Sequence, residues 1–131
     1  MIGLDTNVLV RYLAQDDPVQ SPKATEIIEK RLTEQDPGFI RVVAMAETVW
    51  VLDRVYQLPN MDIATAIERM LQADVFVVEN EQEVFAAVIA LKEEHGPFAD
   101  ALIGELGAKA GCTSTITFDR KALRLPGFEL A

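Results

Sequence analysis

Four acidic residues occupy positions from which a carboxylate can do chemistry. Asp5 directly follows the apolar segment 2–4, and Asp119 directly follows the last strand-like segment, in TITFDRK. Glu47 falls in the first turn of the helix expected after the second strand, and Asp100 begins a helix in GPFADALIGELGAKAG. In open α/β sheets, ligands bind beyond the C-terminal ends of the strands. Asp5, Glu47 and Asp119 meet this condition, whereas Asp100 begins a helix that follows another helix. We consider what would follow if all four side chains converged.

Carboxylates that converge need something to offset their repulsion. Two of them about 5 Å apart repel by roughly 3 kcal/mol at an effective dielectric constant near 20. Several such pairs would cost on the order of 10 kcal/mol, which is comparable with the whole stability of a domain. The cluster is thus expected to be hydrated, partly protonated or bound to a metal. Oxygen ligands favour Mg²⁺ or Mn²⁺, and the lone His95 and lone Cys112 leave little for a zinc site.

Two features of this pattern leave alternatives open. Glu79 and Glu81 also follow a strand-like segment, so position alone does not exclude them. Gly104 and Gly107 lie on the Asp100 side of its helix, although glycine costs about 1 kcal/mol against alanine there. They predict either a close approach by a neighbouring backbone or substrate, or simply tight helix packing.

The elements that would position these acids alternate along the chain. Apolar segments predict strands at 2–4, 39–43, 75–78 and 113–117, with a short edge strand in the tail LPGFEL. Helical periodicity predicts helices at 6–13, 22–32, 44–57, 62–73, 80–96 and 98–110, the second with Ser21 as its N-cap. Continuously apolar strands separated by helices indicate an α/β fold with a parallel sheet covered on both faces. At 131 residues, we expect a single domain, 1–131.

The composition is that of a folded globular protein, but its charge limits the choice of partners. Hydrophobic residues make up 50% and charged residues 25%, and no apolar run is long enough to span a membrane. No secretory signal is visible, and a single cysteine favours a reducing, cytoplasmic setting. The net charge of −9 argues against binding nucleic acid mainly through its phosphates. A divalent metal or a basic partner would have to supply positive charge.

Four motifs together resemble a known family: LDTNVLVRYL, AMAETVWVL, FADALI and TFDRKAL. They are similar to those of the PIN-domain ribonucleases, specifically the VapC-type toxins of prokaryotic toxin–antitoxin pairs. The resemblance implies a PIN-like three-layer sandwich with a mainly parallel central sheet. It also implies a Mg²⁺- or Mn²⁺-dependent endoribonuclease that hydrolyses phosphodiester bonds, a VapB-type antitoxin as partner, and a homodimer.

The resemblance also implies roles for individual residues. Asp5 and Asp100 would be the principal metal ligands, Asp119 would assist them, and Glu47 would hold water at the metal. Supporting roles in binding substrate or shaping the pocket fall to Asn7, which would orient Asp5, and to Thr117. Helical spacing places Arg11 on the same face as Asn7, so Arg11 is the best candidate for a phosphate contact, followed by Arg120 and Lys121.

Structural roles compete with several of these assignments. Asp5, Glu47 and Asp100 could be ordinary acids at helix starts, and Asp119 could be a turn residue. Arg11 could equally be a surface or ion-pair arginine. Other positions favour a structural role outright: His95 at a helix end, Cys112 as a small core residue, and the acids Glu79, Glu81, Glu83, Glu93 and Glu94 as a solvated helix face.

The helix ETVWVLDRVYQL is too apolar to be buried on one side only. Its large side chains spread around more than half of the circumference. The second buried side could face a homodimer partner or the antitoxin, or the whole helix could lie in the core.

Other functions fit less well. A haloacid dehalogenase phosphatase needs a second aspartate where this chain has Asn7, and a receiver domain needs a lysine where it has Asp119. The serious alternative is a PIN-like module that binds RNA or protein without cleaving it.

Overall fold

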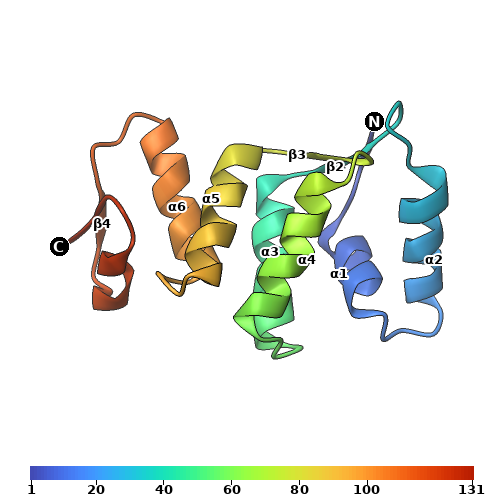
Figure 1. The fold of residues 1–131 in the computed structure, drawn as a ribbon, viewed down its shortest axis with the longest axis horizontal. Coiled ribbons are helices and arrows are strands. Elements are labelled where there is room, and N and C mark those ends of the chain that lie inside the picture. The colour runs from blue at the N-terminus through green and yellow to red at the C-terminus, as the bar shows by residue number, and fades with distance from the viewer. The chain divides into compact units, whose positions relative to one another are not determined.

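The computed structural model describes all 131 residues, which form two compact units (Figure 1). Residues 1–80 make up the first unit and residues 81–131 the second. Helices and parallel strands occur in both, so the predicted α/β class is confirmed. None of the helices combines the length and the apolar character that a membrane span requires.

The first unit contains a three-stranded parallel sheet in the order β1-β2-β3. Gly3 pairs with Phe39 in the central strand, which in turn pairs with Val77. The elements in chain order are β1 (Ile2–Gly3), α1 (Thr6–Ala14), α2 (Gln20–Glu26), the π-helix η1 (Ile27–Arg31), β2 (Gly38–Ile40), α3 (Val42–Arg54), α4 (Asn60–Gln72) and β3 (Phe76–Val78).

The core of this unit forms where its helices meet. Helix α1 packs against α2 and α3, and α3 packs against α4 (Figure 1). The largest fully buried side chains come from the central strand and from α1, α3 and α4: Leu9, Ile40, Met45, Leu52, Ile63 and Ile67. Each such side chain contributes about 1.5–3 kcal/mol through its burial. The strand that leads to Asp5 therefore belongs to a unit whose helices form a well-packed core.

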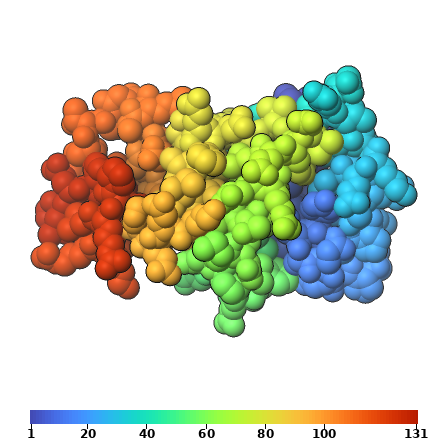
Figure 2. All heavy atoms as spheres, viewed as in Figure 1, coloured from blue at the N-terminus to red at the C-terminus, as the bar shows by residue number.

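The second unit pairs two helices with a small parallel sheet of two strands, β4 and β5. Its elements are α5 (Glu81–Lys92), α6 (Phe98–Lys109), β4 (Thr115–Thr117), the 3₁₀-helix η2 (Arg120–Arg124) and β5 (Phe128–Leu130). Helix α5 packs against α6. The C-terminal segment, red in Figure 2, reaches the surface of this unit. The edge strand predicted in the tail is thus confirmed as β5.

A close contact inside the second unit explains Gly104. A Cβ atom added there would lie 2.6 Å from Cε2 of Phe128, so only glycine leaves room for the ring. At Gly107 the nearest atom would be Oγ1 of Thr115, at 3.4 Å. Gly104 therefore supports tight packing between α6 and β5, which is one of the two interpretations that the sequence left open.

Three helices, α2, α3 and α4, each begin two residues earlier than predicted, α4 at Asn60 rather than at residue 62. Ser21 is not an N-cap, because α2 already begins at Gln20. The carboxylate of Asp17 accepts the backbone N–H groups of Val19 and Gln20, at 2.9 and 2.7 Å. The second strand ends at Ile40 rather than at residue 43, since α3 already begins at Val42.

The structure also corrects one prediction about burial and excludes one alternative. Cys112 is exposed in the turn after α6 and is not a core residue. Helix α3 does not lie wholly in the core, because the side chain of Trp50 is 57% exposed and Val43 is exposed too, as is Val55 at the C-cap. Its core side carries Met45 and Leu52, whose side chains are completely buried. One face of α3 is therefore free for a second contact.

Candidate active site

Asp5 lies between the first strand and the first helix. One residue, Leu4, separates it from β1, and it is the N-cap of α1. Its Oδ1 accepts the backbone N–H of Thr6 at 2.8 Å. The side chain is exposed. The helix start thus fixes the direction of this carboxylate while leaving it accessible to a ligand.

Thr6 joins Asp5 to Glu47. Its buried hydroxyl donates a hydrogen bond to Oε1 of Glu47 at 2.9 Å, and its backbone N–H donates to Oδ1 of Asp5. No other hydrogen bond reaches either carboxylate, so one oxygen of each is available to a ligand. Sequence analysis did not single out Thr6. The available signal was a hydroxyl residue next to the candidate acid and one turn before the apolar Leu9 and Val10.

Glu79 holds the helix that carries Glu47. Its Oε1 accepts the backbone N–H of Val42, the first residue of α3, at 2.8 Å, and the Nε of Arg41 at 3.2 Å. These hydrogen bonds, the one from Val42 above all, lower the pKa of Glu79. The prediction of a solvated helix face was therefore wrong for Glu79, which caps α3 instead. Glu83 was also assigned to that face, but it pairs with Lys109 at 3.2 Å.

The second unit brings Asp100 and Asp119 together. Asp100 lies half-buried in the first turn of α6, and Asp119 follows β4. Burial raises the pKa of Asp100, and the negative charge of Asp119 raises it further. The two carboxylates are thus close enough to repel each other, which is the electrostatic condition that favours a cation.

Two hydrogen bonds fix Asp119 in this arrangement. Its backbone N–H donates to Oγ1 of Thr117 at 3.0 Å, and its Oδ1 accepts the backbone N–H of Lys121 at 2.9 Å. Thr117 therefore supports the turn that presents Asp119. Its predicted part in substrate binding stays a prediction.

Asn7 and Arg11 are placed differently from the acids. Asn7 is exposed on α1, and the hydrogen bond to Asp5 comes from Thr6 instead. The guanidinium of Arg11 forms a salt bridge with Asp16 at 3.3 Å and also donates to Gln20 and to the hydroxyl of Tyr56. Arg11 thus stabilises the end of α1. A phosphate contact by Arg11 stays a prediction.

The donor atoms of the two pairs are all carboxylate oxygens. Asp5 and Glu47 lie in the first unit, Asp100 and Asp119 in the second, and neither unit by itself gathers three potential metal ligands. Oxygen donors of this kind suit Mg²⁺ or Mn²⁺. The residues present therefore fit a hard divalent cation.

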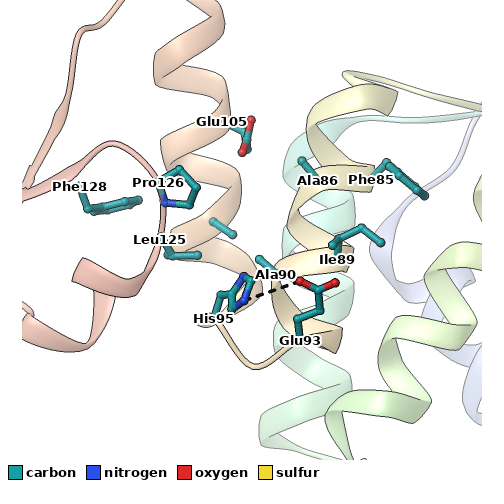
Figure 3. Close-up of a pocket in the computed structure, with 11 residues that line it drawn as sticks. Phe85, Ala86, Ile89, Ala90, Glu93, His95, Glu105, Leu125, Pro126 and Phe128 are labelled. Atoms are coloured by element: carbon teal, nitrogen blue, oxygen red, sulfur yellow. Dashed lines mark ion pairs between the residues drawn. The ribbon is translucent and has the colours of Figure 1, made fainter.

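A separate pocket of about 330 Å³ lies within the second unit (Figure 3). Its walls are mainly apolar and include Ile89, Leu125 and Phe128. His95 and Glu93 form an ion pair at its rim, with 3.6 Å between Nε2 and Oε2. None of the four candidate acids lines this pocket, so it is distinct from the acidic pairs.

The comparison with known families identifies the fold. A model of the PIN domain matches residues 2–127, a span that contains all four acids. The chain belongs to the PIN-domain family. Among curated proteins, this PIN domain is similar to a VapC ribonuclease of Aquifex aeolicus (strain VF5), with 25% identity over 127 residues. That alignment covers 96% of this chain and 92% of the relative.

Proposed function

We propose that this PIN domain is a metal-dependent endoribonuclease, the toxin component of a type II toxin–antitoxin system. One observation carries the proposal: a PIN chain similar to a VapC ribonuclease presents two pairs of acids, each held by its own unit. The substrate would be an RNA phosphodiester bond.

We infer that both pairs act on one metal site. Asp5, Asp100 and Asp119 would hold Mg²⁺ or Mn²⁺, and Glu47 would orient a water next to it. When bound, such a cation lowers the pKa of a water molecule and neutralises charge on the phosphate. The mutual repulsion of Asp100 and Asp119 supports this assignment, since a cation would relieve it.

The chain's own residues would keep these groups in place. Thr6 would hold Asp5 and Glu47 in a fixed relation through its backbone N–H and its hydroxyl. Glu79 would fix the start of α3, one turn before Glu47. Carboxylates on packed elements lose little freedom when they bind a ligand, which favours catalysis.

The partners follow from the same similarity. We propose a VapB-type antitoxin and a second copy of the chain as binding partners, in the cytoplasm. The exposed side of α3 that carries Val43 and Trp50 is a suitable apolar contact for either of them. A net charge of −9 would suit a basic antitoxin.

Cleavage of a mixed RNA pool tests the proposed activity. The wild-type protein should cleave in Mg²⁺ and stop in EDTA, and Asp5→Asn should reduce the rate by at least about 100-fold, because loss even of an outer-shell partner of a metal ligand costs 10–100-fold. Asp62→Asn is the matched control, since Asp62 is an exposed acid in the first turn of α4. Cleavage that persists in EDTA would refute the metal mechanism. RNA binding without any cleavage would instead establish the silent binding module.

A further inference from the structure

The segment after β4 exposes an aromatic ring directly beside Asp119. The side chain of Phe118 is 92% exposed, more than any other large apolar side chain of the chain. Exposing so large an apolar group forfeits the stabilisation that its burial would provide. Phe118 therefore has no packing role within the segment that carries it.

The same segment concentrates positive charge in an acidic protein. Arg120, Lys121 and Arg124 fall within the five residues of η2, and all three side chains are exposed. No salt bridge involves any of them, whereas Arg11 and Arg41 pair with carboxylates. A chain with a net charge of −9 thus carries three unneutralised cations next to one of its candidate metal ligands.

A hydrogen bond and two buried side chains anchor this segment. The carboxylate of Asp119 caps η2 through the N–H of Lys121. Ala122 and Leu125 are buried, and Leu125 packs so closely on Gly96 that a Cβ there would lie 2.9 Å from its Cδ1. With its apolar side anchored, η2 presents its three cations to solvent. A surface held in this way loses little conformational entropy on binding.

We propose that Phe118, Arg120, Lys121 and Arg124 form a binding surface for single-stranded RNA. Phe118 stacks on the base that flanks the cleaved phosphate, and the three cations contact phosphates further along the strand. Exposed aromatic rings combined with cations are the means by which proteins bind single strands, because every base offers a π-face and every linkage a charge. The proposal rests on the proposed nuclease function, since Asp119 locates the reacting phosphate.

Binding of a short fluorescent single-stranded RNA, measured by anisotropy, tests the stacking role. The Asp5→Asn protein serves as background so that the RNA stays intact. Phe118→Leu should weaken binding by about 5-fold to 150-fold, which corresponds to the 1–3 kcal/mol of one base–aromatic stack. Phe118→Tyr should bind like the parent because it keeps the ring. Phe85→Leu, at an exposed ring on α5, should change nothing.

An oligonucleotide with abasic sites separates bases from phosphates. With this RNA, the parent protein and its Phe118→Leu variant should bind equally well, because no base remains to stack. Arg124→Gln should still weaken binding, and it should make the negative slope of log K against log salt shallower by about 0.7, the value for one phosphate contact on a single strand. Phe118→Leu should leave that slope unchanged.

Any of three results for Phe118→Leu would refute the proposed RNA-binding surface. Its affinity for RNA could be unaltered, its loss of affinity could be equally large with abasic RNA, or a fall in its melting temperature could account for the loss of affinity. The last would mean that Phe118 packs against protein. A different result would refute the proposed nuclease function alone: wild-type protein does not cleave RNA in Mg²⁺, but Phe118→Leu still weakens RNA binding. If cleavage needs Mg²⁺ but Phe118→Leu binds normally, only the surface is refuted.

Discussion

At the scale of single residues, the candidate site depends on how neighbouring groups hold each acid. Asp5 and Asp119 were placed correctly at strand ends from the sequence, because a strand followed by an acid is a local pattern. The sequence did not reveal Thr6, whose importance comes from a hydrogen bond to Glu47, 41 positions away. A threonine at a helix start is too common for its type alone to signal that contact.

Thr6→Val should reduce RNA cleavage by roughly 10-fold to 100-fold, as is typical when a group that orients a metal ligand or its water is lost. Valine has nearly the same shape but cannot donate to Glu47, so that carboxylate loses its fixed direction. Thr6→Ser keeps the hydroxyl and should retain most of the activity. Rates of RNA cleavage in Mg²⁺ measure both effects. Equal rates for the Thr6→Val and Thr6→Ser proteins would show that the hydroxyl has no part in the site.

Asp100→Asn should raise the melting temperature of the metal-free protein at neutral pH, by roughly 1–3 °C. The pKa of Asp100 is raised in the fold by burial and by Asp119, so the folded state keeps this proton to higher pH than the unfolded chain does. Stability is therefore lost as pH rises through that pKa, and asparagine removes the loss.

Thermal unfolding in EDTA at a series of pH values checks this prediction. The advantage of Asp100→Asn should fade as the pH falls below the ordinary pKa of aspartate, where both proteins are neutral at this position. Asp62→Asn should show no such gain. A lower melting temperature for Asp100→Asn at neutral pH would contradict the repulsion inferred for Asp100 and Asp119.

At the scale of elements, the alternation of strands and helices followed from the sequence, but several boundaries did not. Hydrophobic periodicity located all six α-helices and the strands, since it records which side is buried. The start of α3 depends on Glu79, whose carboxylate comes from 37 positions away in the sequence. Capping by a distant side chain leaves no local pattern, which is why the second strand was predicted too long.

Gly104→Ala should destabilise the protein by about 1–3 kcal/mol, as overpacking does. The added Cβ would lie 2.6 Å from the ring of Phe128. Gly107→Ala is the matched control on the same helix, where the nearest atom is 3.4 Å away and alanine gains helix propensity. Urea denaturation measures both variants. Combining Gly104→Ala with Phe128→Leu should recover part of the loss, and a Gly104→Ala protein as stable as Gly107→Ala would contradict the close contact.

At the scale of the whole molecule, the net charge is consistent with the proposed nuclease, which would approach RNA through a cation. A net charge of −9 repels phosphate, and the candidate acids add to that repulsion unless a metal neutralises them. The sequence indicated the four acids and, through its motifs, the PIN family, which the match over residues 2–127 confirms. It could not reveal how the acids are held in pairs, because that depends on contacts within each unit.

We propose that the two pairs of acids serve one metal site, and titration of the protein with Mn²⁺ tests this proposal most directly. Isothermal calorimetry should show that Asp5→Asn, in the first unit, and Asp100→Asn, in the second, each abolish or strongly weaken the same binding event, while Asp62→Asn leaves it intact. Two independent binding events, one lost in each variant, or Mn²⁺ affinity that survives either substitution, would contradict the account.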